Sequence, residues 1–76
     1  MKFSKVSKQY KQLNMDIREE MRNLKISQGD LAYQLNLTQA AISQKLSGKV
    51  EWSLWEIMNV FDILGIDFDY ERRSND

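Results

Sequence analysis

Hydrogen-bonding side chains recur on one side of a short stretch between residues 38 and 47. Gln39 and Gln44 carry amides, Ser43 carries a hydroxyl group, and the stretch contains no acidic residue. A glutamine amide can donate to adenine and accept from it at once in the major groove of DNA. A helix with such an outer face can therefore lie in a DNA groove. The candidates for reading base edges are Gln39, Ala40, Ser43 and Gln44.

Two short helices joined by a tight turn are expected to position this face. Ser27 is a good N-cap for the first helix, and Asp30 completes a capping box. Asn36 tolerates the left-handed conformation that ends this helix, and Thr38 is the N-cap of the second. The inner face of the second helix is expected to consist of Ala41, Ile42 and Leu46, with Lys45 at its edge.

These residues also resemble a known family. From Ser27 to Gly48 the chain reads Ser-Gln-x-x-Leu-Ala-x-x-Leu-x-Leu-Thr-Gln-x-x-Ile-Ser-x-x-x-x-Gly. This pattern resembles the helix-turn-helix of the phage repressor and Cro family of DNA-binding proteins (lambda-repressor-like, XRE-type). The resemblance implies an all-α fold, a four- to five-helix lambda-repressor-like DNA-binding domain, with a recognition helix at about residues 38–46. It also implies that Gln28 bonds a phosphate and braces Gln39.

Residues at the borders of this face are expected to hold the DNA backbone. Gly48 should close the recognition helix with a positive φ. Backbone amides near Gly48, together with Lys49, would then hold a phosphate on the flank of the groove. The expected backbone contacts are Gln28, Thr38, Lys45, Ser47, Gly48 and Lys49.

A long amphipathic stretch precedes these helices. Apolar residues recur every three or four positions from Phe3 to Leu24, which is the pattern of a helix. Two interpretations are open: one helix over residues 4–24, or a break near Asn14 or Asp16, where a second capping-box pattern begins.

The chain is expected to divide into three regions. Residues 1–13 form an N-terminal extension that should be helical, 14–70 form the helix-turn-helix DNA-binding domain, and 71–76 form a disordered tail. The extension either packs on its own domain or frays, or its apolar stripe docks a partner or a second subunit. Relatives often hold a buried ion pair where this chain has Met21 and Leu46, so we expect these two apolar residues to touch.

The C-terminal part contains the clearest capping box, Ser53 with Glu56, and Gly65 should end the helix that it starts. Trp52 is expected to be buried and Trp55 partly buried at an edge. The inward residues of this helix are expected to be Leu54, Ile57, Met58, Phe61 and Leu64.

Two smaller features leave alternatives open. Residues 66–70 alternate between apolar and acidic side chains, which favours a short strand, although relatives begin a fifth helix here. Tyr33 is expected to cover the surface of the N-terminal amphipathic helix that ends at Leu24, with a phosphate contact as the alternative.

Charge is unevenly distributed in a chain whose net charge is zero. Residues 1–13 carry four lysines and no acid, residues 14–24 sum to −1, residues 25–50 to +2, and residues 51–76 to −5. The front of the molecule is therefore mildly basic and the tail acidic. Few cations near the helix-turn-helix imply few phosphate contacts for each subunit, and hence modest affinity unless subunits pair.

The composition argues against several kinds of chemistry. The chain has no histidine and no cysteine, so it lacks the usual general base and the usual zinc ligands, and only weak nucleophile–base pairs such as Ser–Lys could be built. We expect no enzyme activity, no metal site, no cofactor and no small-molecule substrate. No apolar run reaches the roughly 18 residues of a membrane span, and no signal segment opens the chain. We therefore expect no membrane association and a cytoplasmic location.

Two functions are consistent with these observations. The first is a sequence-specific, repressor-like transcriptional regulator that binds double-stranded DNA as a homodimer on two half-sites. The alternative is a protein-interaction module, such as an antirepressor or a complex subunit, that keeps the fold without specific DNA binding. Uncharged outer-face residues favour the first function; zero net charge, the acidic tail and the apolar N-terminal stripe favour the second.

Overall fold

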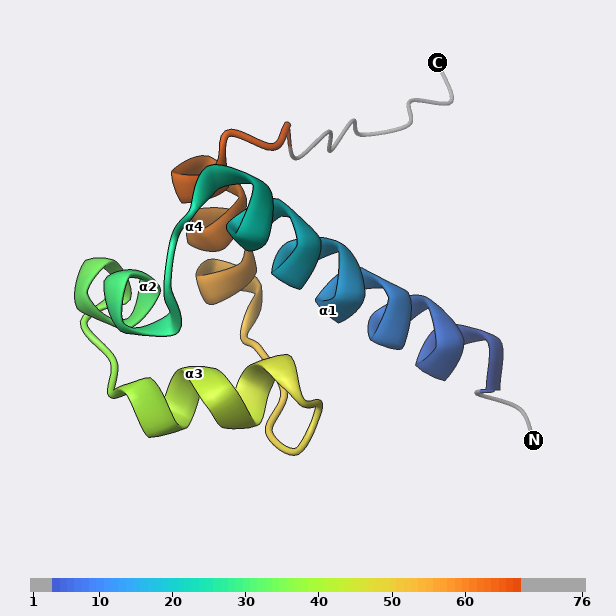
Figure 1. Cartoon of the computed structure of the whole chain (residues 1–76). Helices are drawn as coiled ribbons and strands as arrows, with labels where there is room; N and C mark the ends of the chain where they lie inside the picture. Colours follow the sequence, from blue (N-terminus) through green and yellow to red (C-terminus); the bar gives the residue numbers. More distant parts are fainter. Residues whose placement is uncertain (1–3, 68–76) are drawn as a thin grey trace, which may run out of the picture.

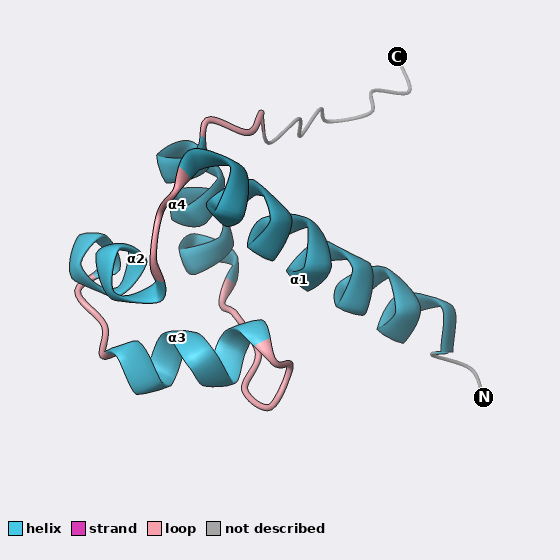
Figure 2. Ribbon diagram, in the orientation of Figure 1, coloured by secondary structure: helices cyan, strands magenta, loops and turns pink. Residues whose placement is uncertain are grey.

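The computed structural model describes residues 4–67, with side chains from residue 7 onward, and this part of the chain is all-α, without a strand (Figures 1 and 2). From about Tyr10 onward α1 packs with the rest of the protein, whereas its first turns extend past the other helices (Figure 1). The helices are α1 (Ser4–Leu24), α2 (Gln28–Leu35), α3 (Gln39–Leu46) and α4 (Leu54–Leu64).

The first helix is continuous, so the interpretation of one helix over residues 4–24 is confirmed. The capping box expected to break it does not form, because the helix runs without interruption through Asp16. The Asp16 carboxylate instead accepts a hydrogen bond from the Gln12 amide at 2.9 Å, one turn earlier. Asn14 lies in the middle of α1 and is buried. The expected domain boundary between residues 13 and 14 thus falls inside a helix.

Every helix contributes one fully buried side chain to the core. These residues lie at 0% exposure, and burying each contributes roughly 1.5–3 kcal/mol relative to an exposed position. Met21, Leu46 and Trp52 are buried around them. The four fully buried residues are Ile17, Leu31, Ile42 and Val60.

The ends of the short helices follow the predicted capping residues. Ser27 and Asp30 form a reciprocal capping box with both hydrogen bonds at 3.0 Å, and Ser53 and Glu56 form another. Asn36 ends α2 in the left-handed conformation with φ 59°. Positive φ angles are also confirmed at two glycines, Gly48 at 86° and Gly65 at 72°.

The orientation of α4 differs from the prediction. Leu54, Trp55 and Met58 are exposed, at 67%, 75% and 45%, although Leu54 and Met58 were expected to point inward and Trp55 to be partly buried. The buried residues of α4 are Ile57, Val60 and Leu64. Several apolar residues lie all round this helix, and the side that meets the core is centred on Val60, with Phe61 and Ile63 half-buried against the core on either side.

Part of the predicted C-terminal region cannot be compared with the structure. Ile66 and Asp67 belong to neither a helix nor a strand. Most of the alternating segment at 66–70, and the tail expected to be disordered at 71–76, lie outside the described residues.

Candidate nucleic-acid interface

The turn between α2 and α3 is built from local hydrogen bonds. The Thr38 hydroxyl oxygen accepts a hydrogen bond from the Ala41 N–H at 3.0 Å and caps α3. The Leu37 N–H donates to the Ala32 carbonyl at 2.9 Å, which closes α2. Leu37 is half-buried against the core. The two helices therefore leave this corner in different directions, and α3 lies along one side of the molecule (Figure 1).

The outer face of α3 brings the predicted base-reading residues together. Gln39, Ala40, Ser43 and Gln44 are all exposed, and Ser47 continues this face past the end of the helix. Within the described residues, the side chains of Gln39, Ser43 and Gln44 have no hydrogen-bond partner, whereas the Ser47 hydroxyl donates to the Gln44 carbonyl at 3.0 Å. An uncharged face of free amides and hydroxyls therefore points into solvent.

The family resemblance implies that Gln28 braces Gln39, and no hydrogen bond joins these two side chains in the structure. The Gln39 amide oxygen instead lies against the first turn of α2, 3.6 Å from the place that a Cβ atom on Gly29 would occupy. An added Cβ atom would make only ordinary van der Waals contact at this distance, so the position of Gln39 does not require a glycine at residue 29.

The backbone amides around Gly48 are used inside the protein. The Gly48 N–H donates to the Lys45 carbonyl at 3.2 Å, and the N–H groups of Lys49 and Val50 donate to the Gln44 carbonyl at 2.9 and 3.1 Å. They close the end of α3, so the prediction that these amides hold a phosphate has to be corrected. The Lys49 side chain is exposed and remains a candidate for a backbone contact.

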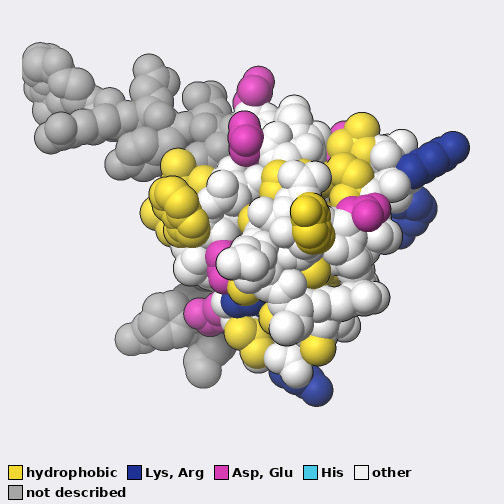
Figure 3. Space-filling model, turned by 90° about the vertical axis from the view of Figure 1, so that its left-hand side faces the viewer, with side chains coloured by type: hydrophobic (Ala, Val, Ile, Leu, Met, Phe, Trp, Pro, Cys, Tyr) yellow, Lys and Arg dark blue, Asp and Glu magenta, His cyan; other side chains and the backbone are white. Residues whose placement is uncertain are grey.

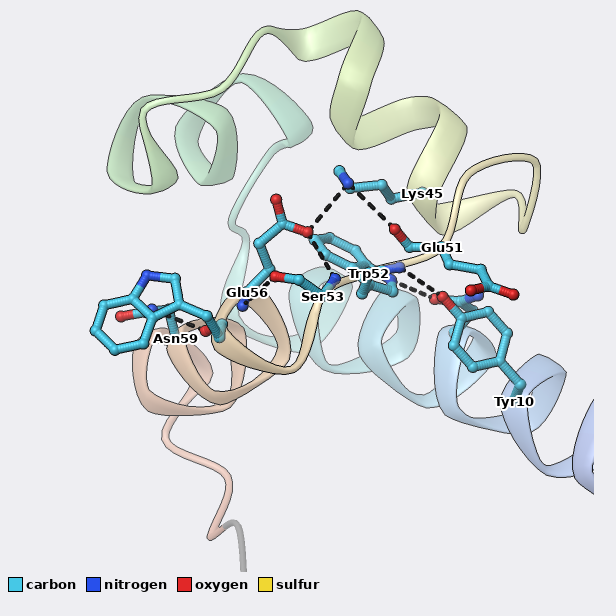
Figure 4. Close-up of polar contacts among 9 residues, drawn as sticks. Tyr10, Lys45, Glu51, Trp52, Ser53, Glu56 and Asn59 are labelled. Atoms are coloured by element: carbon cyan, nitrogen blue, oxygen red, sulfur yellow. Dashed lines mark hydrogen bonds and ion pairs between the residues drawn. The ribbon is translucent and has the colours of Figure 1, made fainter.

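Lys45, a predicted backbone contact, faces the protein instead. Its ammonium group forms an ion pair with Glu56 Oε1 at 3.0 Å and donates to the Glu51 carbonyl at 3.3 Å (Figure 4). It also lies 5.9 Å from the centre of the Trp52 ring. Its side chain is only 12% exposed. These contacts tie α3 to α4, and we exclude Lys45 from the candidate DNA contacts.

Glu56 combines two structural roles at the start of α4. Its Oε1 atom accepts a hydrogen bond from the Ser53 N–H at 2.9 Å as well as the ion pair from Lys45. Burial alone would raise the pKa of this carboxyl, but the Ser53 N–H and the Lys45 ammonium outweigh burial and hold the pKa below its ordinary value. The carboxylate is therefore the stable form at neutral pH.

Trp52 connects the loop after α3 to α1, and its predicted burial is confirmed at 7% exposure. Its indole N–H donates to Asn14 Oδ1 at 2.8 Å, and its backbone N–H donates to the Tyr10 hydroxyl oxygen at 2.8 Å (Figure 4). Sequence reasoning missed both partners. The available signal was that Asn14 lies four residues after Tyr10 and three before Ile17, on the apolar stripe of α1.

Two further predictions concern Tyr33 on α2 and the proximity of Met21 to Leu46. Tyr33 does not cover α1, because it is 87% exposed while its neighbours Leu31 and Ala32 occupy the inner face of α2. Met21 and Leu46 are both buried in the core and line the same groove, in agreement with their predicted proximity.

Among the described residues, no group of three or more acidic, histidine or cysteine side chains is placed to hold a metal ion, and no helix is long and apolar enough to cross a membrane. On the face that includes α2, hydrophobic side chains lie in separate groups among polar ones (Figure 3). Comparison with family models, curated proteins and solved structures gave no match for this chain.

Proposed function

We propose that this protein is a sequence-specific, repressor-like regulator that binds double-stranded DNA. In this proposal the fold is of the lambda-repressor type, and α3 lies in the major groove with its outer face towards the bases. The observation that carries the proposal is the outer face of α3, which is exposed, uncharged and rich in free hydrogen-bonding groups. Such a regulator would act in the cytoplasm.

The proposed contacts divide into base contacts and backbone contacts. Gln39 and Gln44 are proposed to bond adenine edges, while Ala40 and Ser43 allow the helix to approach closely. The positions along α3 support these roles, because residues 40, 43, 44 and 47 share one face of a helix and Gln39 lies at the edge of that face, one turn before Ser43. The proposed backbone contacts are Gln28, Thr38, Ser47 and Lys49.

A homodimer on DNA is part of this proposal. α3 contains eight residues, and one helix of this length reads few base pairs. Two subunits on half-sites one helical turn apart would double the number of bases read. A stoichiometry of two chains to one duplex in the selected complex is the expected result.

Selection of bound sequences from a random pool of duplexes tests the readout. Replacing Gln39 by Ala should cost roughly 1–3 kcal/mol at one base pair and relax selection there, leaving the other positions unchanged. The matched control is Gln34→Ala, because Gln34 is an equally exposed amide that lies on α2 and outside the outer face of α3. Equal loss of affinity on all sequences would contradict a reading role for Gln39.

A protein-interaction module is the second candidate function. It is favoured by Leu54, Trp55 and Met58, three large apolar side chains that α4 exposes together. The distinguishing measurement is retention on duplex DNA at near-physiological salt. A correctly folded protein that shifts no duplex in the selection belongs to this second class.

A further inference from the structure

Three cations of α1 lie on one side of the helix. Lys11, Arg18 and Arg22 are separated by seven and four residues, so they lie within roughly 40° of one another around the helix axis. The acidic residues of the same helix, Asp16, Glu19 and Glu20, lie further round the axis. We call the line of Lys11, Arg18 and Arg22 the basic flank of α1.

Two grooves place the basic flank beside α3. Arg18 and Arg22 line a groove of about 360 Å³ together with Gln28 and Leu46. Lys11 and Arg18 line a second groove of about 250 Å³ together with the turn at Ser47 and Gly48. Arg18 thus lies between the start of α2 and the end of α3, and none of the three acids of α1 lines either of these two grooves. Asp16 and Glu19 meet Arg18 and Arg22 only in a further groove, of about 270 Å³, which no residue of α2 or α3 lines.

These cations are available for a partner. All three side chains are exposed, and within the described part of the chain none of them forms an ion pair or a side-chain hydrogen bond. Lys45 is the opposite case, because its ammonium group is held by Glu56 and Glu51. The positive charge beside the outer face of α3 therefore comes from α1 more than from α3 itself.

The shape of this charge fits a nucleic-acid backbone. From Lys11 to Arg22 the basic flank runs for about 16 Å along the helix. Duplex DNA carries one negative charge for about every 1.7 Å of its axis, so a line of this length faces several phosphates. Gln28 and Ser47, two of the proposed backbone contacts, lie in the walls of the same grooves.

We propose that the basic flank of α1 binds the phosphates of the DNA strand that runs beside α3. This inference rests on the proposed function and adds three cations to its backbone contacts. Lys11 belongs to the N-terminal extension, so the long first helix lengthens the protein's footprint on the duplex. Phosphate contacts of this kind position the protein and raise affinity without selecting a sequence.

The test is the dependence of duplex affinity on salt concentration. Replacing Arg18 by Gln should reduce the slope of log K against log salt by about 0.9, the value for one lost phosphate contact. The control is Lys8→Gln, which makes the same change of charge on the same helix at an exposed residue that lines neither groove. Its slope should equal that of the wild type.

Two further variants separate contact from net charge. Arg18→Gln combined with Glu20→Gln keeps the net charge of the wild type and should still show the reduced slope. Arg18→Lys retains the cation and should restore the slope. Lys8 and Arg18 are exposed, and the half-buried Glu20 forms no ion pair or side-chain hydrogen bond among the described residues. All of these variants should therefore keep the wild-type melting temperature in circular dichroism.

The outcomes distinguish this inference from the proposed function. A wild-type protein without salt-dependent duplex binding overturns both. A wild-type protein that binds, with Arg18→Gln and wild type sharing one slope, overturns only the role of the basic flank. The same holds if Lys8→Gln lowers the slope as much as Arg18→Gln. Tighter binding of single-stranded RNA of equal length than of the duplex overturns both.

Discussion

The two sides of α3 differ in how their polar groups are used. On the inner side, Lys45 is held by Glu56 and by the Glu51 carbonyl, next to the buried Trp52. On the outer side, the side chains of Gln39 and Gln44 have no partner among the described residues. Polar groups on the inner side therefore fix the helix, and polar groups on the outer side are free to bind.

This difference bears on recognition because a reading helix must be held rigidly. α3 has only eight residues, too few for an isolated helix to be stable in water. Its position depends on burial of Ile42 and Leu46 and on the contacts made by Lys45. A fixed backbone reduces the ordering cost when the outer side chains bind.

The largest expected effect concerns the inner side, at Trp52. Replacing Trp52 by Ala should lower the free energy of unfolding by about 3–5 kcal/mol, because it leaves a cavity and removes the indole hydrogen bond to Asn14. Denaturant unfolding measures this loss. The matched control is Trp55→Ala, which should change stability by no more than about 0.5 kcal/mol because Trp55 is 75% exposed. Similar losses for both tryptophans would contradict the packing described for α4.

Sequence reasoning succeeds for features that depend on neighbouring residues and misses contacts between distant ones. The capping boxes of Ser27 and Ser53, and the left-handed Asn36, were predicted correctly because each depends on residues within one turn. The burial of Trp52 was predicted, but its partners on α1 were not. Asn14 lies 38 residues away in the chain, and no local rule pairs the two.

Features that depend on which side of a helix meets the core were predicted less well. Apolar residues lie all round α4, so the sequence allowed several inward faces, and burial of Val60 was missed. The side on which the charges of α1 lie was equally hard to predict from a sum over the sequence. Residues 14–24 sum to −1, and only the helical positions of Arg18 and Arg22 show that the cations share one flank.

A smaller effect is expected for the ion pair that holds α3 to α4. Replacing Lys45 by Met should lower the free energy of unfolding by about 1–2 kcal/mol, between the values for exposed and for buried pairs. Lys49→Met is the control, since Lys49 is exposed and forms no ion pair in the described structure; its stability should change by about 0.5 kcal/mol or less. A stability loss in the Lys49 variant equal to that in the Lys45 variant would remove the distinction between the two lysines.

The ion pair between Lys45 and Glu56 also predicts a dependence of stability on pH. The pKa of Glu56 is lower in the folded protein than its ordinary value of 4.5, so the unfolded chain binds the proton more tightly. The contribution of Glu56 is therefore complete above pH 4.5 and is lost as the pH falls through the folded pKa. Without the Lys45 cation this pKa rises towards its ordinary value, so stability of the Lys45→Met variant should fall less below pH 4.5. Parallel losses in the variant and the wild type would contradict this coupling.

The smallest effect on stability is expected on the outer side of α3, at Gln44. Replacing Gln44 by Ala removes an exposed amide that has no partner and introduces the residue with the highest helix propensity. Stability should therefore change by no more than about 0.5 kcal/mol, while discrimination at one base pair of the selected duplex should fall by roughly 1–3 kcal/mol. Unfolding and duplex binding, measured on the same preparation, provide the two readouts. A clear loss of stability would show that Gln44 takes part in the internal contacts of α3. The outer side of α3 would then also hold the helix in place, which would contradict the contrast between the two sides.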